Sequence, residues 1–520
     1  MRKLVLATAL LMSAPAMAQN VVEASIEDLQ AKMAAGATSE AVTKEYLERI
    51  TQMDRKGPTL RSVIAVIPGA MGQAQASDAR RKAGKLLGPL DGIPVLIKDN
   101  IETWELPTSA GSLALRSNWT KRDAPVVAQL RAAGAVILGK TNLSEWANIR
   151  STKSMSGWSA VGGLVRNPYA LDRTACGSSS GSGAAVAASF SAVALGTETD
   201  GSVVCPASMN GLVGLKPTIG LVSRTYVVPI SHSQDTPGPM ARSVKDAAFL
   251  FSAMIGSDPA DAATKDADKY RRDYAAGLSV DALKGKRIGY WKPAMPGDLG
   301  KRFDKALEEL RAAGAVLVEV KMPTLEGLGA AELLVFKAEL KADLAAYLAT
   351  LPAKTVKVKT LGDVIAFNEA QAEAEMPFFG QEIFADAEKT KGLDDAEYKA
   401  AREKSLRMAK GALDGMLKEA NATILVSPTY GTPWLSDPVA GDQYSGPSAS
   451  TLPAISGYPH LTVPMGLVSG LPAGLSFIGS AYSDGELLSA GYAYEQATKA
   501  RVAPDYLPTI PADLGARVLK

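Results

Sequence analysis

Small hydroxyl-bearing residues and glycines gather in two short stretches near the middle of the chain. The stretch 176–183 reads Cys-Gly-Ser-Ser-Ser-Gly-Ser-Gly, and the stretch 197–202 reads Thr-Glu-Thr-Asp-Gly-Ser. Residues 184–194 between them are almost all small and apolar, which predicts a buried helix. A Gly/Ser loop that opens onto a helix presents hydroxyls and backbone N–H groups, so it suits a phosphate or a negatively charged reaction intermediate.

Two interpretations of these stretches differ in chemistry. One is a flexible turn or phosphate-binding loop, and the other is a serine-nucleophile site. The order Asp200-Gly201-Ser202 places a serine directly after a tight glycine turn, and upstream the apolar run 93–97 ends in Lys98. Burial at the end of a strand disfavours the ammonium form and lowers a lysine pKa from about 10.4, so such a lysine can act as a base. These features favour the serine nucleophile.

At the same residues the sequence resembles the amidase signature family. That family has a Gly-Ser-Ser-rich stretch, a second serine 24 positions after the first motif serine, and a lysine well upstream; Ser178 and Ser202 have this separation, and Lys98 has the expected place. The resemblance implies that Ser202 is the nucleophile, that Ser178 is a bridging serine held by a cis peptide bond after Gly177, and that Lys98 is the base. Weaker similarity extends over about residues 25–500.

The residue types suit amide hydrolysis. Neutral Lys98 would take a proton from Ser178, which would take one from Ser202 as Ser202 attacks the carbonyl, and Ser178 would return a proton to the departing amine. One backbone donor to the oxyanion typically contributes about 3–4 kcal/mol to transition-state stabilisation. We expect the oxyanion hole to consist of the backbone N–H groups of Thr199, Asp200, Gly201 and Ser202.

Composition and patterning define the class of protein. The 520 residues carry a net charge of +2 with both signs spread along the chain, which gives no support to nucleic-acid binding or to an acidic partner. Alternating helices and short apolar strands predict an α/β sheet covered on both faces. The resemblance implies the amidase signature fold, a large mixed central sheet in one unit over residues 19–520. Polar, helix-prone insertions are expected near residues 256–285 and 350–400, around the pocket mouth.

The few histidines and cysteines limit metal and redox chemistry. The two histidines are far apart, so we expect no zinc site, and the resemblance implies no cofactor. His460 precedes a strand-like run and is expected to be structural. His232 is expected in a loop, either lining the pocket or, as we favour, solvated. Cys176 and Cys205 flank the proposed site and would form a disulfide in an oxidising compartment or remain two small buried thiols; the thiols are slightly favoured.

The N-terminus predicts export. Arg2 and Lys3 precede an apolar run at residues 4–12, and Ala16-Met17-Ala18 gives a small-x-small cleavage pattern. This arrangement is typical of a secretory signal peptide over residues 1–18. The apolar run is too short to span a bilayer, so the mature protein is expected free of the membrane, in the periplasm if the source is Gram-negative.

Other residues are expected to support the site or line its pocket. Lys140 also follows a strand and is the rival base, and Asn142 is expected to brace the site. Ser179, beside Ser178, is a further candidate for support. Phe379 and Gln381 are candidates for the pocket wall, with packing in the core as the alternative for this segment.

The substrate is predicted from two places in the sequence. Many members of the family have an arginine two positions after the nucleophile, where this chain has Val204, so small anionic half-amides are not favoured. The stretch 199–206, with 379–382, resembles the peptide amidase branch, whose members release ammonia from the C-terminal amide of peptides and leave internal bonds intact. A broad aliphatic or aryl amidase is the alternative. The amidase subunit of a tRNA-dependent amidotransferase is disfavoured by the export signal. An exported binding protein with an inactive site is disfavoured because all three catalytic side chains are present. The oligomeric state stays open.

Overall fold

One large sheet forms the centre of the molecule. The computed structural model describes residues 21–511, so the expected signal peptide lies outside the described part. The strands of the sheet are β1 (Val63–Val66), β2 (Pro94–Lys98), β3 (Val136–Thr141), β6 (Val193–Glu198), β7 (Val213–Lys216), β8 (Thr236–Ala241), β9 (Arg287–Tyr290), β10 (Val316–Glu319), β11 (Ile424–Pro428), β12 (His460–Val468) and β13 (Leu471–Gly479). They lie in the order β1-β3-β2-β6-β8-β7-β12-β13-β11-β9-β10, with both parallel and antiparallel neighbours. The predicted mixed α/β sheet is confirmed.

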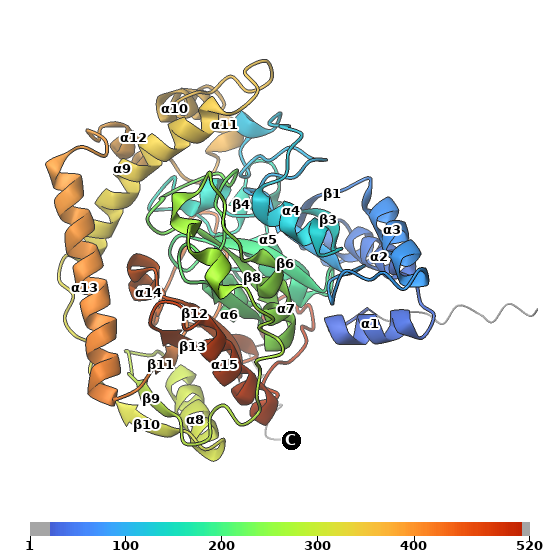
Figure 1. Ribbon diagram of the computed structural model, residues 1–520. Helices are drawn as coiled ribbons and strands as arrows, with labels where there is room; N and C mark the ends of the chain where they lie inside the picture. The colour runs from blue at the N-terminus through green and yellow to red at the C-terminus, as the bar shows by residue number, and fades with distance from the viewer. Residues whose placement is uncertain (1–20, 512–520) are drawn as a thin grey trace, which may run out of the picture.

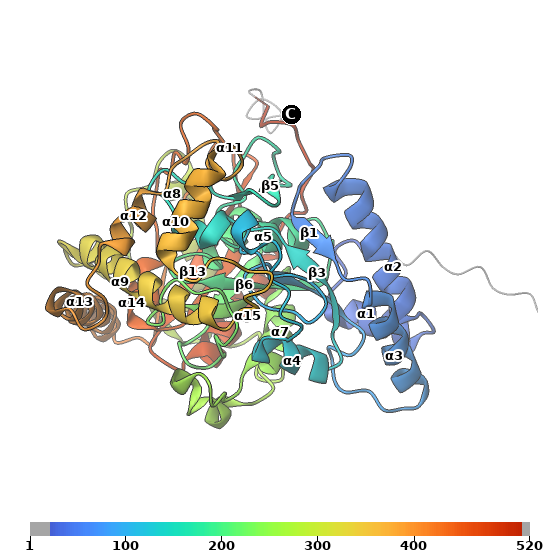
Figure 2. The same cartoon turned by 90° about the horizontal axis from the view of Figure 1, so that it is seen from above.

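Helices flank this sheet (Figure 1). They are α1 (Ile26–Ala34), α2 (Ser39–Arg49), α3 (Ala70–Lys82), α4 (Pro125–Ala132), α5 (Ser180–Ala187), α6 (Val204–Met209), α7 (Val244–Met254), α8 (Leu299–Ala312), α9 (Leu328–Ala349), α10 (Leu361–Ala370), α11 (Ala372–Glu375), α12 (Glu382–Glu388), α13 (Ala396–Ala420), α14 (Thr451–Ser456) and α15 (Asp484–Thr498). The long helices α9 and α13 pack against each other at the outer side of the molecule, as both views show (Figures 1 and 2). No helix within residues 21–511 is both long and apolar enough to cross a bilayer.

Two of the predicted helical regions differ from the structure. The helix expected over residues 184–194 ends at Ala187, and a turn then leads into β6 at Val193, because Val193 and Ala194 pair with β2 and β8 in the sheet. The insertion at 256–285 holds only short 3-10 turns. Its aspartates hydrogen-bond to nearby backbone and side-chain groups, as Asp261 does to Ala263 N and to the side chain of Arg224, and such bonds compete with a regular helix. The insertion at 350–400 is helical, as expected, and contains α10, α11 and α12.

The topology brings the chemistry-bearing residues to one edge of the sheet. β2 is parallel to β3 on one side and to β6 on the other, so the carboxyl ends of the three strands lie side by side. Lys98 ends β2 and Thr141 ends β3, and Thr197 is the penultimate residue of β6. The loop between β6 and α6 begins at this edge. The loop before α5 packs against it and brings Ser178 to Lys98.

Candidate active site

Lys98 lies fully buried at the end of β2. Its Nζ is 2.7 Å from Ser178 Oγ and donates to Thr197 Oγ1 at 2.8 Å and to the Thr197 carbonyl at 3.3 Å. Burial lowers the pKa of Lys98 to about 7, against the opposing effect of the charges on Asp235 and Glu198. A lysine in this state is half neutral near pH 7, so it can accept a proton under ordinary conditions.

The loop that carries Ser178 is held on both sides. The Gly177–Ser178 peptide bond is cis, as the resemblance implies, and the Ser178 carbonyl accepts from Ser144 N at 3.0 Å. A Cβ at Gly177 would lie 2.5 Å from Ser144 Oγ, which explains the glycine there. Ser179 donates its N–H to the Ser202 carbonyl at 3.2 Å and its hydroxyl to the Thr197 carbonyl at 3.1 Å. The loops of the two serines are therefore packed directly against each other.

Ser202 opens onto a pocket of about 270 Å³. Its turn is fixed because Glu198 Oε2 accepts from the backbone N–H groups of Val203 and Val204, at 2.8 and 3.0 Å. Gly201 has φ +79°, a backbone conformation that favours glycine. Within residues 21–511, no group accepts a hydrogen bond from the backbone N–H groups of residues 199–202. These donors are free for a bound oxyanion.

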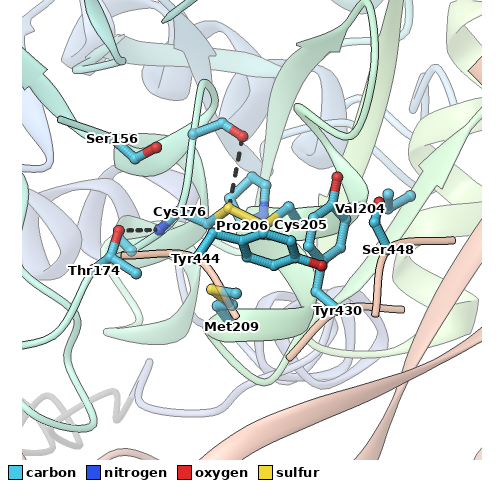
Figure 3. Close-up of a disulfide and its surroundings, with 12 residues drawn as sticks. Ser156, Thr174, Cys176, Val204, Cys205, Pro206, Met209, Tyr430, Tyr444 and Ser448 are labelled. Atoms are coloured by element: carbon cyan, nitrogen blue, oxygen red, sulfur yellow. Dashed lines mark hydrogen bonds between the residues drawn. A yellow bond between two sulfur atoms is a disulfide. The ribbon is translucent and has the colours of Figure 1, made fainter. Parts of the chain in front are cut away.

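A disulfide ties the two serine loops together (Figure 3). Cys176 precedes Ser178 by two positions and Cys205 follows Ser202 by three, and their Cα atoms are 6.0 Å apart. The slight preference for two free thiols is therefore wrong. The two loops pack against each other, and this brings the sulfurs together. The two cysteines are 29 residues apart in the sequence, and this separation does not reveal the contact. Both cysteines line the pocket, and the bond packs against Met209.

The rival base and the two histidines lie elsewhere. Lys140 is buried, but its Nζ donates to the Ile101 carbonyl at 2.6 Å and pairs with Asp99 at 3.2 Å. His232 is in a loop and lines a different hollow, and 46% of its side chain is exposed, in agreement with the favoured interpretation. His460 is fully buried in β12, with Nε2 2.6 Å from the hydroxyl of Ser476 in the neighbouring strand, and is structural as expected.

Among residues 21–511, one group of side chains has the spacing of a metal site. The ligand atoms of His232, Glu339 and Asp343 lie within 4.8 Å of one another. However, Glu339 Oε1 already accepts from Ser233 Oγ at 2.5 Å and from Tyr398 Oη at 2.7 Å, and His232 Nδ1 is 2.9 Å from Asp343. Hydrogen bonds thus already hold these three side chains in place.

Asn142 braces the loops around the site, as expected. Its Nδ2 donates to the carbonyls of Arg61 and Gly163, both at 3.0 Å, and its Oδ1 accepts from Ser159 Oγ at 2.7 Å. Its backbone carbonyl accepts from Gly181 N, in the first turn of α5. Asn142 thus connects the end of β3 to the helix that follows the Ser178 loop.

Phe379 and Gln381 do not line the pocket of Ser202. The Phe379 ring is edge-on to Trp158 at 5.4 Å, and the Arg150 guanidinium lies 4.3 Å from its centroid. Gln381 exchanges hydrogen bonds with Asn368 and the Ile365 carbonyl. The expectation that they form pocket wall is corrected, and the alternative, packing in the interior, holds for both.

Sequence reasoning missed most of the pocket wall. It comes from α9 and from the segment between β11 and α14, which carries several aromatic residues among glycines and prolines. That clustering of aromatic residues in a turn-rich segment is the sequence feature that could have indicated the pocket wall. The pocket is lined by Ala147, Asn148, Ile149, Ser156, Cys176, Gly177, Thr199, Asp200, Ser202, Cys205, Ile230, Phe336, Tyr430, Trp434, Asp442 and Tyr444.

Comparisons with known proteins agree with this geometry. The model of the family described as Amidase matches residues 41–488. The structure is similar to that of native peptide amidase from Stenotrophomonas maltophilia, with a TM-score of 0.88 and 48% identity, covering 94% of this chain and 99% of that one. A probable amidase of Arabidopsis thaliana is 39% identical, with 97% of both chains covered. A glutamyl-tRNA(Gln) amidotransferase subunit of Thermobifida fusca is 35% identical, over 94% of this chain and 98% of that protein.

Proposed function

Because the chain belongs to the amidase signature family and is a serine amidohydrolase, we propose that its substrates are C-terminal amides of peptides, which it converts to the free acid and ammonia. The 48% identity with a peptide amidase supports this narrower substrate class. The pocket supports it as well, because Val204 stands where an arginine would bind a small anionic amide and no lysine, arginine or histidine is among the described lining residues.

The relay begins at Lys98. Its two N–H bonds in the neutral form point to the two oxygens of Thr197, which leaves the lone pair facing Ser178 Oγ. Thr197 Oγ1 also accepts from Asn100 Nδ2 at 2.9 Å, so its two lone pairs are both used and its orientation is fixed. Lys98 then takes the proton of Ser178, Ser178 takes the proton of Ser202, and Ser202 Oγ attacks the amide carbon.

The remaining steps use the same groups. The free N–H groups of residues 199–202 stabilise the oxyanion of the tetrahedral intermediate. Ser178 gives its proton to the amide nitrogen and regains one from protonated Lys98, the C–N bond breaks, and ammonia leaves an acyl-enzyme on Ser202 with Lys98 neutral again. Water, deprotonated through the same relay, hydrolyses the ester and restores Ser202. The 2.7 Å contact between Lys98 Nζ and Ser178 Oγ, inside a fully buried site, is the observation that carries this proposal.

The substrate is tested by incubating the mature protein with an N-acetylated tripeptide amide. We expect one equivalent of ammonia and a peptide acid whose internal bonds are intact, measured by a coupled ammonia assay and mass spectrometry. Ser202→Ala is the control and should release none. Turnover of aryl or simple aliphatic amides without turnover of the peptide amide would reject the peptide assignment and favour the broad amidase.

A role in a tRNA-dependent amidotransferase is the other function that whole-chain similarity suggests. Free glutamine carries an α-carboxylate, and that anion needs a cation or several donors when it is buried. The described lining of the pocket instead contains two carboxyl groups, Asp200 and Asp442. These carboxyl groups argue against glutamine as the substrate. They favour a substrate whose groups near the attacked amide are blocked or uncharged.

We further propose that the protein acts after export, in an oxidising compartment such as a periplasm. The signal-peptide pattern at residues 1–18 and the Cys176–Cys205 disulfide support this location, because disulfides persist in oxidising compartments and are rare in the cytosol. Expression in a Gram-negative host with osmotic-shock fractionation tests it. Processed protein that begins at Gln19 is expected in the shock fluid, and full-length protein confined to the cytosol would contradict the proposal.

A further inference from the structure

Two carboxyl groups line the pocket beside Ser202. Asp200 and Asp442 are the carboxylate residues among its described lining, and within residues 21–511 neither carboxylate forms an ion pair with a lysine, arginine or histidine. Asp442 accepts from Ser156 Oγ at 2.5 Å and from Trp434 Nε1 at 3.0 Å, and Asp200 Oδ2 accepts from Thr451 Oγ1 at 2.9 Å. All these donors are neutral. Burial raises the pKa of both carboxyl groups. The charge of Lys216 opposes this shift at Asp200, and a cation bound in the pocket would oppose it at both.

Aromatic rings form the wall beside these carboxylates. Tyr444 is edge-on to Tyr430, at 5.8 Å between centroids, and to Trp434, at 5.6 Å. Its single hydroxyl proton has the carbonyls of Gly446 and Pro447 as acceptors, which fixes the phenol end of the ring. The hydrogen bond to Asp442 orients the Trp434 indole in the same way. Aromatic faces next to carboxylates are the chemistry that recognises alkylammonium and guanidinium groups.

The size of the pocket limits what it can hold. At about 270 Å³ it is smaller than the roughly 300–1,000 Å³ of typical small-molecule sites, so it accommodates one residue rather than an extended peptide. The residue that enters it is the one that bears the amide attacked by Ser202.

We propose that Asp442, Asp200 and the rings of Trp434 and Tyr444 select peptide amides whose C-terminal residue has a basic side chain. This inference rests on the proposed peptide-amide activity and assigns the specificity of the same site. The cation lies among the rings and next to the carboxylates, and a substrate with an acidic side chain is repelled by the same charges.

The test compares kcat/KM for N-acetylated lysine amide, norleucine amide and glutamate amide. Norleucine matches the lysine stem without its charge. We expect lysine to exceed norleucine by about tenfold and glutamate to be the poorest of the three. Equal values for lysine and norleucine would overturn the inference. Norleucine amide with a free α-amine is compared with its acetylated form as well. If the only preference is for the form with the free α-amine, the inference is also overturned, because the cation that the pocket recognises is then the α-amine and not a side chain.

Variants assign the preference to these residues. Asp442→Asn should lower the lysine-to-norleucine ratio several-fold, mainly through KM for the lysine amide. Asp437→Asn is the matched control. Asp437 is an acidic residue of the same segment, but it lies outside the pocket and accepts hydrogen bonds from Val439 N and Ala440 N. This variant should keep the original ratio. Tyr444→Leu, which retains the carboxylates, should also lower the ratio. An unchanged ratio in both pocket variants would refute the assignment, whereas absence of turnover for every acetylated amide would reject the peptide-amide function itself.

Discussion

Replacement of Lys98 by methionine removes the proposed base while keeping an apolar stem of similar length. At its ordinary pKa of 10.5 a lysine is about 0.03% neutral at pH 7, whereas at the pKa of about 7 that burial gives Lys98 it is about half neutral. Burial thus increases the reactive fraction by roughly a thousandfold. Because general-base catalysis typically contributes 10²–10⁴-fold, we expect Lys98→Met to lower kcat/KM by about that factor.

The pH dependence identifies the group. In the wild-type protein kcat/KM should fall about tenfold per pH unit below pH 7, because protonated Lys98 cannot accept the Ser178 proton, and should level off above pH 8. The residual activity of Lys98→Met should lack this acid limb. Ammonia release from a peptide amide between pH 5 and 9 measures both profiles.

Lys140→Met is the matched control. Lys140 is equally buried at the same edge of the sheet, but it pairs with Asp99 and not with a catalytic serine. Its loss leaves Asp99 buried and unpaired, so stability should fall, while the acid limb of the folded enzyme should stay near pH 7. Activity of Lys98→Met within threefold of wild type, or a displaced limb in Lys140→Met, would refute the assignment of Lys98.

Three other predictions concern the loops and the sheet. Replacement of Cys176 and Cys205 by serine should reduce stability by about 2–4 kcal/mol and lower kcat, as thermal unfolding and turnover with and without reductant would show. Gly201→Ala should cost about 100-fold or more in kcat without loss of secondary structure by circular dichroism, because its Cβ would lie 2.1 Å from Tyr430 Oη and displace the oxyanion donors. Burial lowers the pKa of His460 to about 3, so the unfolded chain binds a proton between pH 6.5 and 3 that the folded chain does not. The free energy of unfolding should therefore fall by about 1.4 kcal/mol per pH unit as pH decreases through this window, and His460→Gln should remove that dependence in urea titrations.

The arrangement of the candidate site could be predicted because its signals are local. A lysine that ends an apolar run predicts a buried amine, and the motif spacing of Ser178 and Ser202 relates each serine to a family position. The sheet could be predicted because β-branched runs alternate with helical segments along the chain. These features depend on neighbours a few residues away, which a sequence displays directly.

The pocket could not be predicted in the same way because distant segments build it. Phe336 reaches it from α9, and Tyr430 and Tyr444 reach it from the segment before α14. Phe379 is equally aromatic and lies in a similar turn, yet it packs beneath Arg150. The redox state of Cys176 likewise depends on which loop lies next to it. Packing between remote segments decides these cases, and composition does not distinguish them.

Three buried lysines at strand ends show why burial alone does not make a base. Burial lowers the pKa of Lys140, but Asp99 at 3.2 Å opposes this shift and supports the ammonium form. Burial lowers the pKa of Lys216 to about 8, but its Nζ donates to the Pro217 carbonyl, and no hydroxyl within residues 21–511 is hydrogen-bonded to it. Lys98 alone among the three combines burial, the lack of an ion pair within the described residues, and a serine hydroxyl at 2.7 Å. A base for this reaction therefore requires a neutral amine and an adjacent hydroxyl together, and the fold supplies that combination where the end of β2 meets the Ser178 loop.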